Sequence, residues 1–150
     1  MSPMFLLPVL VGFAVVVQAG MNRQIADHWG LAGSVLLNSA VVLALAIVFY
    51  VLVRWRPELF PEFLQWPDDP GRFAWWRGFV PGVLGITIVA GLPWAFSRLG
   101  ALEVILTVLV AQVVASLFWD ALIEKIPAHP LRVVGAMVAL AGTALASWKR

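Results

Sequence analysis

Five long apolar blocks divide this sequence, and they restrict its possible folds more than any other feature. The blocks cover residues 3–20, 30–53, 74–96, 100–123 and 131–148. Each has about the 20 residues that a helix needs to cross a bilayer. Only 12% of the residues are charged, against about 25% in an average soluble domain. The sequence therefore predicts an all-α bundle of five transmembrane helices in a single domain, residues 1–150.

Neither kind of β-structure fits the apolar blocks. Open strands are excluded because lipid offers no partner for unpaired backbone groups. A closed barrel is excluded because its strands alternate polar and apolar residues, whereas these blocks are continuously apolar. The first block also differs from a signal peptide, since no Lys or Arg precedes it, and we expect it to be retained as a helix.

The longest connection, residues 55–73, combines prolines with apolar and aromatic side chains. The apolar members are Leu59, Phe60, Phe63, Leu64 and Trp66. We expect this connection to lie in the membrane interface with Asp68 and Asp69 toward water. The shortest connection is a turn around residues 97–99, which predicts that the third and fourth helices are antiparallel neighbours.

Small residues recur within two of the blocks. Gly78 and Gly82 form a GxxxG pair in the third block, which also contains Pro81 and Pro93. This pattern fits plain helix packing equally with a moving, discontinuous helix that lines a pathway. In the fifth block, the small residues include Gly135 and Gly142, and here packing or a dimer contact is favoured.

Positive charge is distributed almost evenly between the two sides of a five-helix topology. One side would hold Arg54, Arg56, Arg72, Arg77, Lys125 and Arg132, and the other Arg23, Arg98, Lys149 and Arg150. So weak a bias fits a chain that inserts both ways round, although a single, weakly encoded orientation fits it as well. Two such chains could form an antiparallel homodimer of ten helices, in place of the inverted repeats of a larger transporter.

Few amide or carboxylate side chains lie inside the blocks, where such groups cost free energy and so need a reason. They are Gln18, Asn38, Glu103, Gln112 and Asp120. At about 100° per residue, Gln112 and Ser116 share one side of the fourth helix, with Glu103 opposite. We expect Gln112 and Ser116 to face the bundle interior with Gln18 and Asn38, where they would bind a substrate or join helices by hydrogen bonds.

Two carboxylates and one tryptophan have competing interpretations. Glu103, one turn into its helix, could couple transport to protons, or could reach water, pair with Arg98 or favour the helix dipole. Asp120, at the other end, could meet the interface or a basic neighbour. Trp94 could line the pathway as a stacking surface, although most tryptophans here are predicted to be interface anchors.

Several classes of protein are excluded by what the sequence lacks. It contains no cysteine, and His28 and His129 lie in different connections without metal-ligand spacing. No catalytic set or phosphate-binding loop is recognisable. The basic residues are scattered between apolar runs, unlike a nucleic-acid surface. We therefore predict no enzyme activity, no cofactor, no metal and no nucleic-acid partner.

Four segments taken together resemble the small YdcZ-type branch of the drug/metabolite transporter superfamily. They are QAGMN (18–22), WWRGFVPGVLGITIV (75–89), LGALEVILTVLVAQVVASLFWD (99–120) and LRVVGAMVALAGTALA (131–146). The resemblance implies a five-helix half-transporter that pairs antiparallel, with Gln18, Asn22, Gln112 and Asp120 as site residues. The chain departs from the family pattern at Ala111, where Gly is frequent, and at Glu103, where small or apolar residues are usual.

The favoured function is a small dimeric secondary transporter in the bacterial inner membrane, exporting a small metabolite or organic cation by alternating access. A non-transporting scaffold or accessory subunit is the alternative, because its small-residue faces could hold a partner. A passive channel is the third hypothesis. The sequence does not distinguish among the substrates, the coupling ions or the directions of transport.

Overall fold

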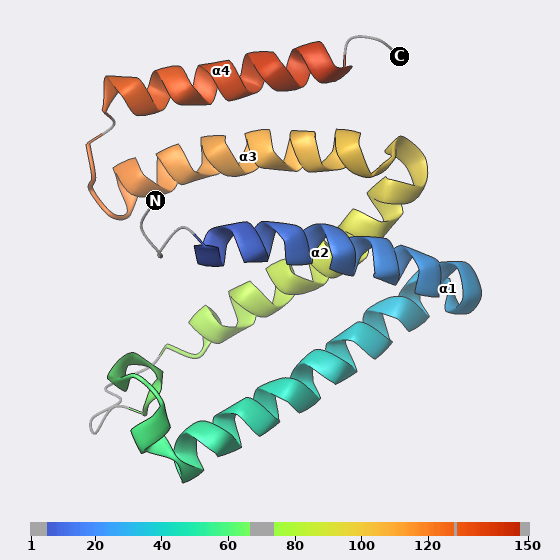
Figure 1. The fold of residues 1–150 in the computed structure, drawn as a ribbon, viewed down its shortest axis with the longest axis vertical. Helices are drawn as coiled ribbons and strands as arrows, with labels where there is room; N and C mark the ends of the chain where they lie inside the picture. The colour runs from blue at the N-terminus through green and yellow to red at the C-terminus, as the bar shows by residue number, and fades with distance from the viewer. Residues whose placement is uncertain (1–5, 67–73, 128, 148–150) are drawn as a thin grey trace. The chain divides into compact units, whose positions relative to one another are not determined.

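The computed structural model describes residues 6–66, 74–127 and 129–147, and the regular structure in this part is helical (Figure 1). Its α-helices are α1 (Leu6–Trp55), α2 (Trp76–Leu99), α3 (Ala101–Leu122) and α4 (Pro130–Ser147). Two short 3-10 turns, η2 (Pro57–Leu59) and η3 (Glu62–Leu64), follow α1. The predicted all-α class is confirmed. Asp68 and Asp69 lie outside the described residues.

The first two predicted helices are joined into one, so the described part has four α-helices and not five separate ones. Helix α1 is 50 residues long and kinked at Gly30, whose φ of 73° and ψ of 161° are essentially restricted to glycine. The chain reverses direction there, giving a first arm (6–29) and a second arm (31–55) (Figure 1). Residues 21–29, expected to connect two helices, are helical because the polar side chains in them are compatible with a helix.

Helices α2 and α3 are joined by Gly100 alone. Its φ of 86° and ψ of 155° again need glycine. The amide of Gly100 donates to the carbonyl of Phe96 at 3.1 Å. The turn therefore lies just after residues 97–99, where the sequence placed it, and those three residues complete the last turn of α2.

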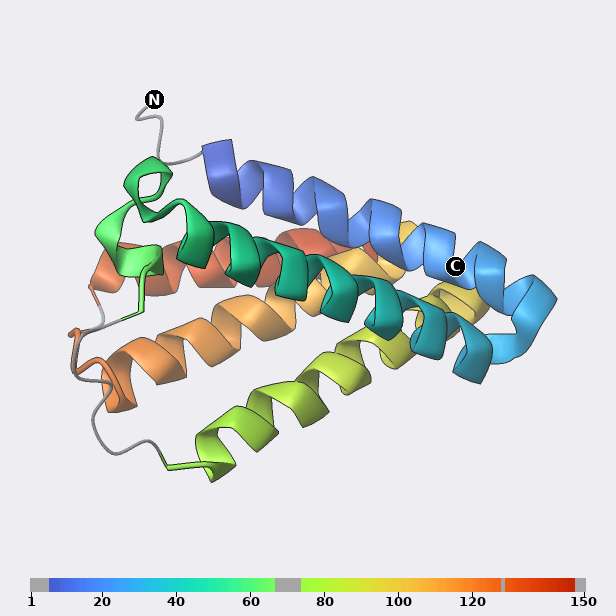
Figure 2. The same cartoon turned by 90° about the horizontal axis from the view of Figure 1, so that it is seen from below.

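The chain forms two compact units. One unit is Val17–Trp94, which contains most of α1, both 3-10 turns and most of α2. The other contains the residues up to Val16 together with those from Ala95 onward. In this second unit α3 and α4 pack against each other (Figures 1 and 2), and Val104 and Ala136 are buried.

Large apolar side chains point outward along the helices. Phe13, Leu36 and Leu102 are each more than 70% exposed. Helices α1, α2 and α3 are each long and apolar enough to cross a membrane, and α4 contains a shorter apolar stretch, Val133–Ala146. Helices this long with so much exposed apolar surface imply contact with a lipid bilayer, and the chain is a membrane protein.

The glycines predicted to pack helices have open space around them. Apart from the adjacent residues and the backbone of its own helix, a Cβ atom added at Gly82, Gly135 or Gly142 would meet no atom of the described residues within 4 Å. Gly78 lies exposed near the start of α2. Within the described part of the chain these glycines therefore do not mediate close packing, and their role in contacts with a second molecule stays a prediction.

Candidate functional site

Three amide side chains from the two arms of α1 meet at one oxygen atom. Gln18 Nε2 donates to Asn38 Oδ1 at 3.0 Å, and Asn22 Nδ2 lies 3.4 Å from the same oxygen. Asn22 is buried and Asn38 is half-buried. The reversal at Gly30 makes this possible, because it sets the second arm beside the first. We call Gln18, Asn22 and Asn38 the amide cluster.

The kink at Gly30 sets the distance between the amide cluster and the end of the hairpin. Asn22 and Asn38 are equally far along the chain from Gly30, about 12 Å at a rise of about 1.5 Å per residue. Polar residues Arg23, Asp27 and His28 are exposed between Asn22 and the kink. The hairpin therefore has a polar tip, followed by the amide cluster within otherwise apolar arms.

Ser34 supports the amide cluster, although the sequence did not single it out. Its side chain is only 1% exposed, and its hydroxyl donates to the backbone carbonyl of Asn22 at 2.7 Å. Ser34 precedes Asn38 by one helical turn, so both lie on the same side of the second arm. The sequence contains a signal for this role of Ser34, because Ser34 and Asn38 are polar residues spaced i, i+4 in an apolar helix.

Replacing Asn38 by Leu is expected to lower the free energy of unfolding by about 1–2 kcal/mol. The substitution removes the oxygen that accepts two hydrogen bonds between the arms, and such bonds contribute about 0.6 kcal/mol each in membrane helices, with a maximum near 1.7. The measurement is unfolding in mixed detergent micelles. Ser39→Ala, on the same arm, is the matched control, and equal stability of the two variants would contradict the prediction.

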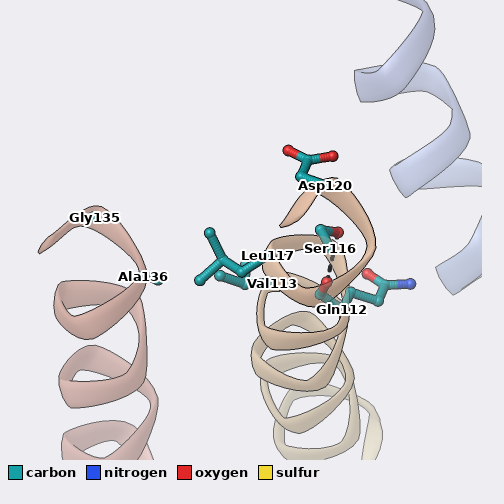
Figure 3. A pocket seen from close by; sticks show the side chains of 7 residues that line it. All are labelled: Gln112, Val113, Ser116, Leu117, Asp120, Gly135 and Ala136. Carbon is teal, nitrogen blue, oxygen red and sulfur yellow. Dashed lines mark hydrogen bonds between the residues drawn. The ribbon is translucent and has the colours of Figure 1, made fainter. Parts of the chain in front are cut away.

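A second polar group lies in an open pocket of about 400 Å³ on α3 and α4. Its lining residues are Gln112, Val113, Ser116, Leu117, Asp120, Gly135 and Ala136. Figure 3 shows Val113 and Leu117 extending toward α4, whereas the side chain of Gln112 extends away from it. Between the two helices the pocket is therefore apolar, and its polar groups lie along α3.

The polar side of the pocket follows one stripe of α3. Ser116 Oγ donates to the backbone carbonyl of Gln112 at 2.6 Å, so this hydroxyl still has lone pairs that can accept a bond (Figure 3). Asp120, one turn further along, is half-buried. An amide, a hydroxyl and a carboxylate one turn apart can together bind a solute that has both donors and acceptors.

Two other predicted site residues, Glu103 and Trp94, belong neither to the amide cluster nor to the lining of the pocket. Glu103 is half-buried in the first turn of α3, where a carboxylate also favours the helix dipole. Trp94 is 57% exposed near the end of α2. The structure thus brings together Gln18, Asn22 and Asn38 in one unit, and Gln112, Ser116 and Asp120 in the other. The expectation that Gln18, Asn38, Gln112 and Ser116 share one interior stays a prediction.

Comparison with known protein families identifies one family model that matches the chain. A family model described as "Putative inner membrane exporter, YdcZ" matches residues 3–145, nearly the whole chain. Neither the curated proteins nor the solved structures that were compared give a match. The matched range includes every residue of the amide cluster and of the pocket.

Proposed function

Since the chain belongs to the YdcZ family of inner membrane exporters, we propose that it is one half of a dimeric secondary transporter that works by alternating access. Its location in the inner membrane follows from the family and from its long apolar helices. Membership of an exporter family also places it among transporters and not in an enzyme class. What we propose beyond this is that the chain forms a dimer, that it crosses the membrane five times and that it exports a small solute.

The amide cluster is the observation that carries the proposal. The cluster joins Gln18 and Asn38, which lie inside the apolar arms, to Asn22, which adjoins the polar residues of the hairpin tip. Amide side chains inside apolar membrane helices are costly and usually mark a substrate pathway. Gln112, Ser116 and Asp120 supply a second polar stripe in the same apolar chain.

The proposed unit is a pair of chains with five crossings each. The two arms of α1 count as two crossings, because 50 residues are about twice the length that one crossing needs. An odd number of crossings and a weak charge bias favour an antiparallel pair, in which the two copies act as inverted repeats. The open glycines of α2 and α4 offer surfaces on which the second copy could pack.

Helix α2 is the proposed moving element. Pro81 and Pro93 lie inside it, and each removes a backbone hydrogen bond and weakens the helix locally. Helices interrupted in this way line the binding sites of many transporters and change shape as access alternates. Trp94 follows the second proline, where movement of α2 would carry it.

Solute release from liposomes tests transport directly. The purified protein would be reconstituted around a mixture of amino acids, sugars, polyamines and quaternary ammonium ions, and release would be followed by mass spectrometry. We expect at least one class to leave faster than from empty liposomes, with a rate that saturates with concentration. Release without saturation would indicate a passive channel, and a folded dimer that releases none of the mixture would contradict the proposal.

A scaffold or accessory subunit is the second candidate, and the open glycines favour it. Gly82, Gly135 and Gly142 could serve as contacts for another membrane protein, because nothing in the described part of the chain covers them. The two functions differ in what the pocket residues do. A scaffold needs the glycine surfaces alone, whereas a transporter also needs the space in the pocket.

A further inference from the structure

The residues that follow α1 form a compact loop held by one side chain. Gln65 Nε2 donates to the backbone carbonyls of Pro57 and Phe60, each at 3.1 Å. These two bonds connect the end of the segment to its beginning and enclose both 3-10 turns. We call residues 57–66 the stapled loop, and Gln65 its staple.

The stapled loop lies back along α1. The ring of Phe60 meets the ring of Phe49 edge-on, with centroids 5.9 Å apart, and Trp66 meets Tyr50 in the same way at 6.4 Å. Phe49 and Tyr50 lie before the end of α1 by about 8 Å at the helical rise. The rings of Phe60 and Trp66 are therefore level with the last turns of the helix and not beyond its end.

The outer surface of the stapled loop is mostly apolar. Leu59 is 71% exposed, Phe63 84% and Trp66 58%. Its charges are Glu62, exposed at the start of η3, and, at the base of the loop, Glu58, which pairs with Arg56 at 3.4 Å. Apolar and aromatic side chains with a few charges among them are stable at the boundary between lipid headgroups and acyl chains.

We propose that the stapled loop is a preformed wedge that inserts into the headgroup and acyl-chain boundary of the bilayer. The occupant of its apolar surface is lipid, because the loop continues directly from a membrane-spanning helix and turns back along it. Gln65 positions the wedge by bonding the backbone carbonyl of Phe60 and by adding a second bond to that of Pro57, which also accepts from the Phe60 amide. The wedge would fix the depth of the second arm of α1. This inference needs a spanning α1 but does not depend on the transport proposal.

Spin labelling tests the position of the wedge. Because the sequence contains no cysteine, the label attaches only at the cysteine that is introduced. A nitroxide would be attached at Phe63→Cys in the full chain, in liposomes of phosphatidylcholine and phosphatidylglycerol. Collision with oxygen and with a water-soluble nickel chelate would be measured, with Leu45→Cys as the lipid reference and Asp27→Cys as the water reference. We expect high oxygen and low nickel collision at position 63, giving a depth between the two references.

Two results would overturn the wedge. Nickel collision at position 63 equal to that at position 27 would place the loop in water. Low collision with both reagents would mean that protein covers the surface, either a second copy of the chain or another partner.

The staple is tested by Gln65→Glu, which keeps the size of the side chain but removes both donors. Nickel collision at position 63 is expected to rise several-fold toward the water reference, because the loop opens. Gln24→Glu, an added charge on the exposed surface of α1, is the matched control and should leave position 63 unchanged. An unchanged signal in Gln65→Glu would show that Gln65 does not hold the wedge.

Discussion

A variant that inserts in one orientation only is expected to form at least about tenfold less dimer than the natural chain. Co-expression with a second variant that inserts only in the opposite orientation should restore the dimer yield. Replacing Arg98, Lys149 and Arg150 by Gln would leave six positive residues on one proposed side and Arg23 alone on the other. Replacing Arg54, Arg56, Arg72, Arg77 and Lys125 by Gln would leave Arg132 alone on the first side against four on the other. Orientation follows this difference, so each variant alone would lack antiparallel partners. Cross-linking in membranes measures the dimer.

Co-expression of the two variants shows whether dimers are lost because antiparallel partners are missing or because the substitutions impair folding. If the substitutions merely impaired folding, the two variants would remain monomeric together as well as apart. Dimers of undiminished yield in each variant alone would instead mean that the chains pair in parallel, and the antiparallel transporter would have to be abandoned.

Filling the pocket by Gly135→Leu is expected to slow solute release at least about tenfold, whereas Gly142→Leu should change it little. Both glycines lie on α4, and at either position an added Cβ would meet no atom of the described residues within 4 Å apart from the adjacent residues and the backbone of α4 itself. Only Gly135 lines the pocket of Gln112, Ser116 and Asp120. A leucine there would occupy space that the solute needs, at a cost of at least about 1.4 kcal/mol in transport. The measurement is release of the solute that the liposome mixture identifies.

The same pair of variants distinguishes a transporter from a scaffold. A scaffold that uses the small-residue surface of α4 would be damaged by leucine at either position. Dimer yield, measured for both, shows whether the surface itself is involved. Equal loss of solute release and of dimers in both variants would show that these glycines serve in helix packing and would contradict a role of the pocket in transport.

The helical segments could be predicted because their apolar lengths match the membrane, whereas the backbone at their junctions could not. The sequence predicts that Arg23, Asp27 and His28 belong to a connection, yet polar residues are compatible with a helix that ends a hairpin, and the first arm of α1 continues up to the kink at Gly30. The sequence predicts the turn after α2 at residues 97–99, and it lies at Gly100. In both places the structural signal was a single glycine, which sequence periodicity does not distinguish from a glycine inside a helix.

The candidate site was also only partly predictable, because the sequence shows which polar side chains are present but not which backbone groups they bind. Amide side chains in apolar segments are conspicuous in a sequence, which identifies Gln18 and Asn38, and the family resemblance adds Asn22. Ser34 and Gln65 were missed because each acts by binding a backbone carbonyl, a contact that depends on how the chain turns. The added family match confirms the expected YdcZ membership and the inner membrane location, and the roles of individual residues stay predictions.

Labelling of single cysteines in intact cells tests the central claim most directly. Cysteine would replace Asp27 at the tip of the α1 hairpin or Glu124 after α3, both exposed, and react with a membrane-impermeant maleimide before and after permeabilisation. Five crossings inserted both ways round predict that about half of each variant is labelled in intact cells. Complete labelling at one position and none at the other would show a single orientation and contradict the antiparallel dimer.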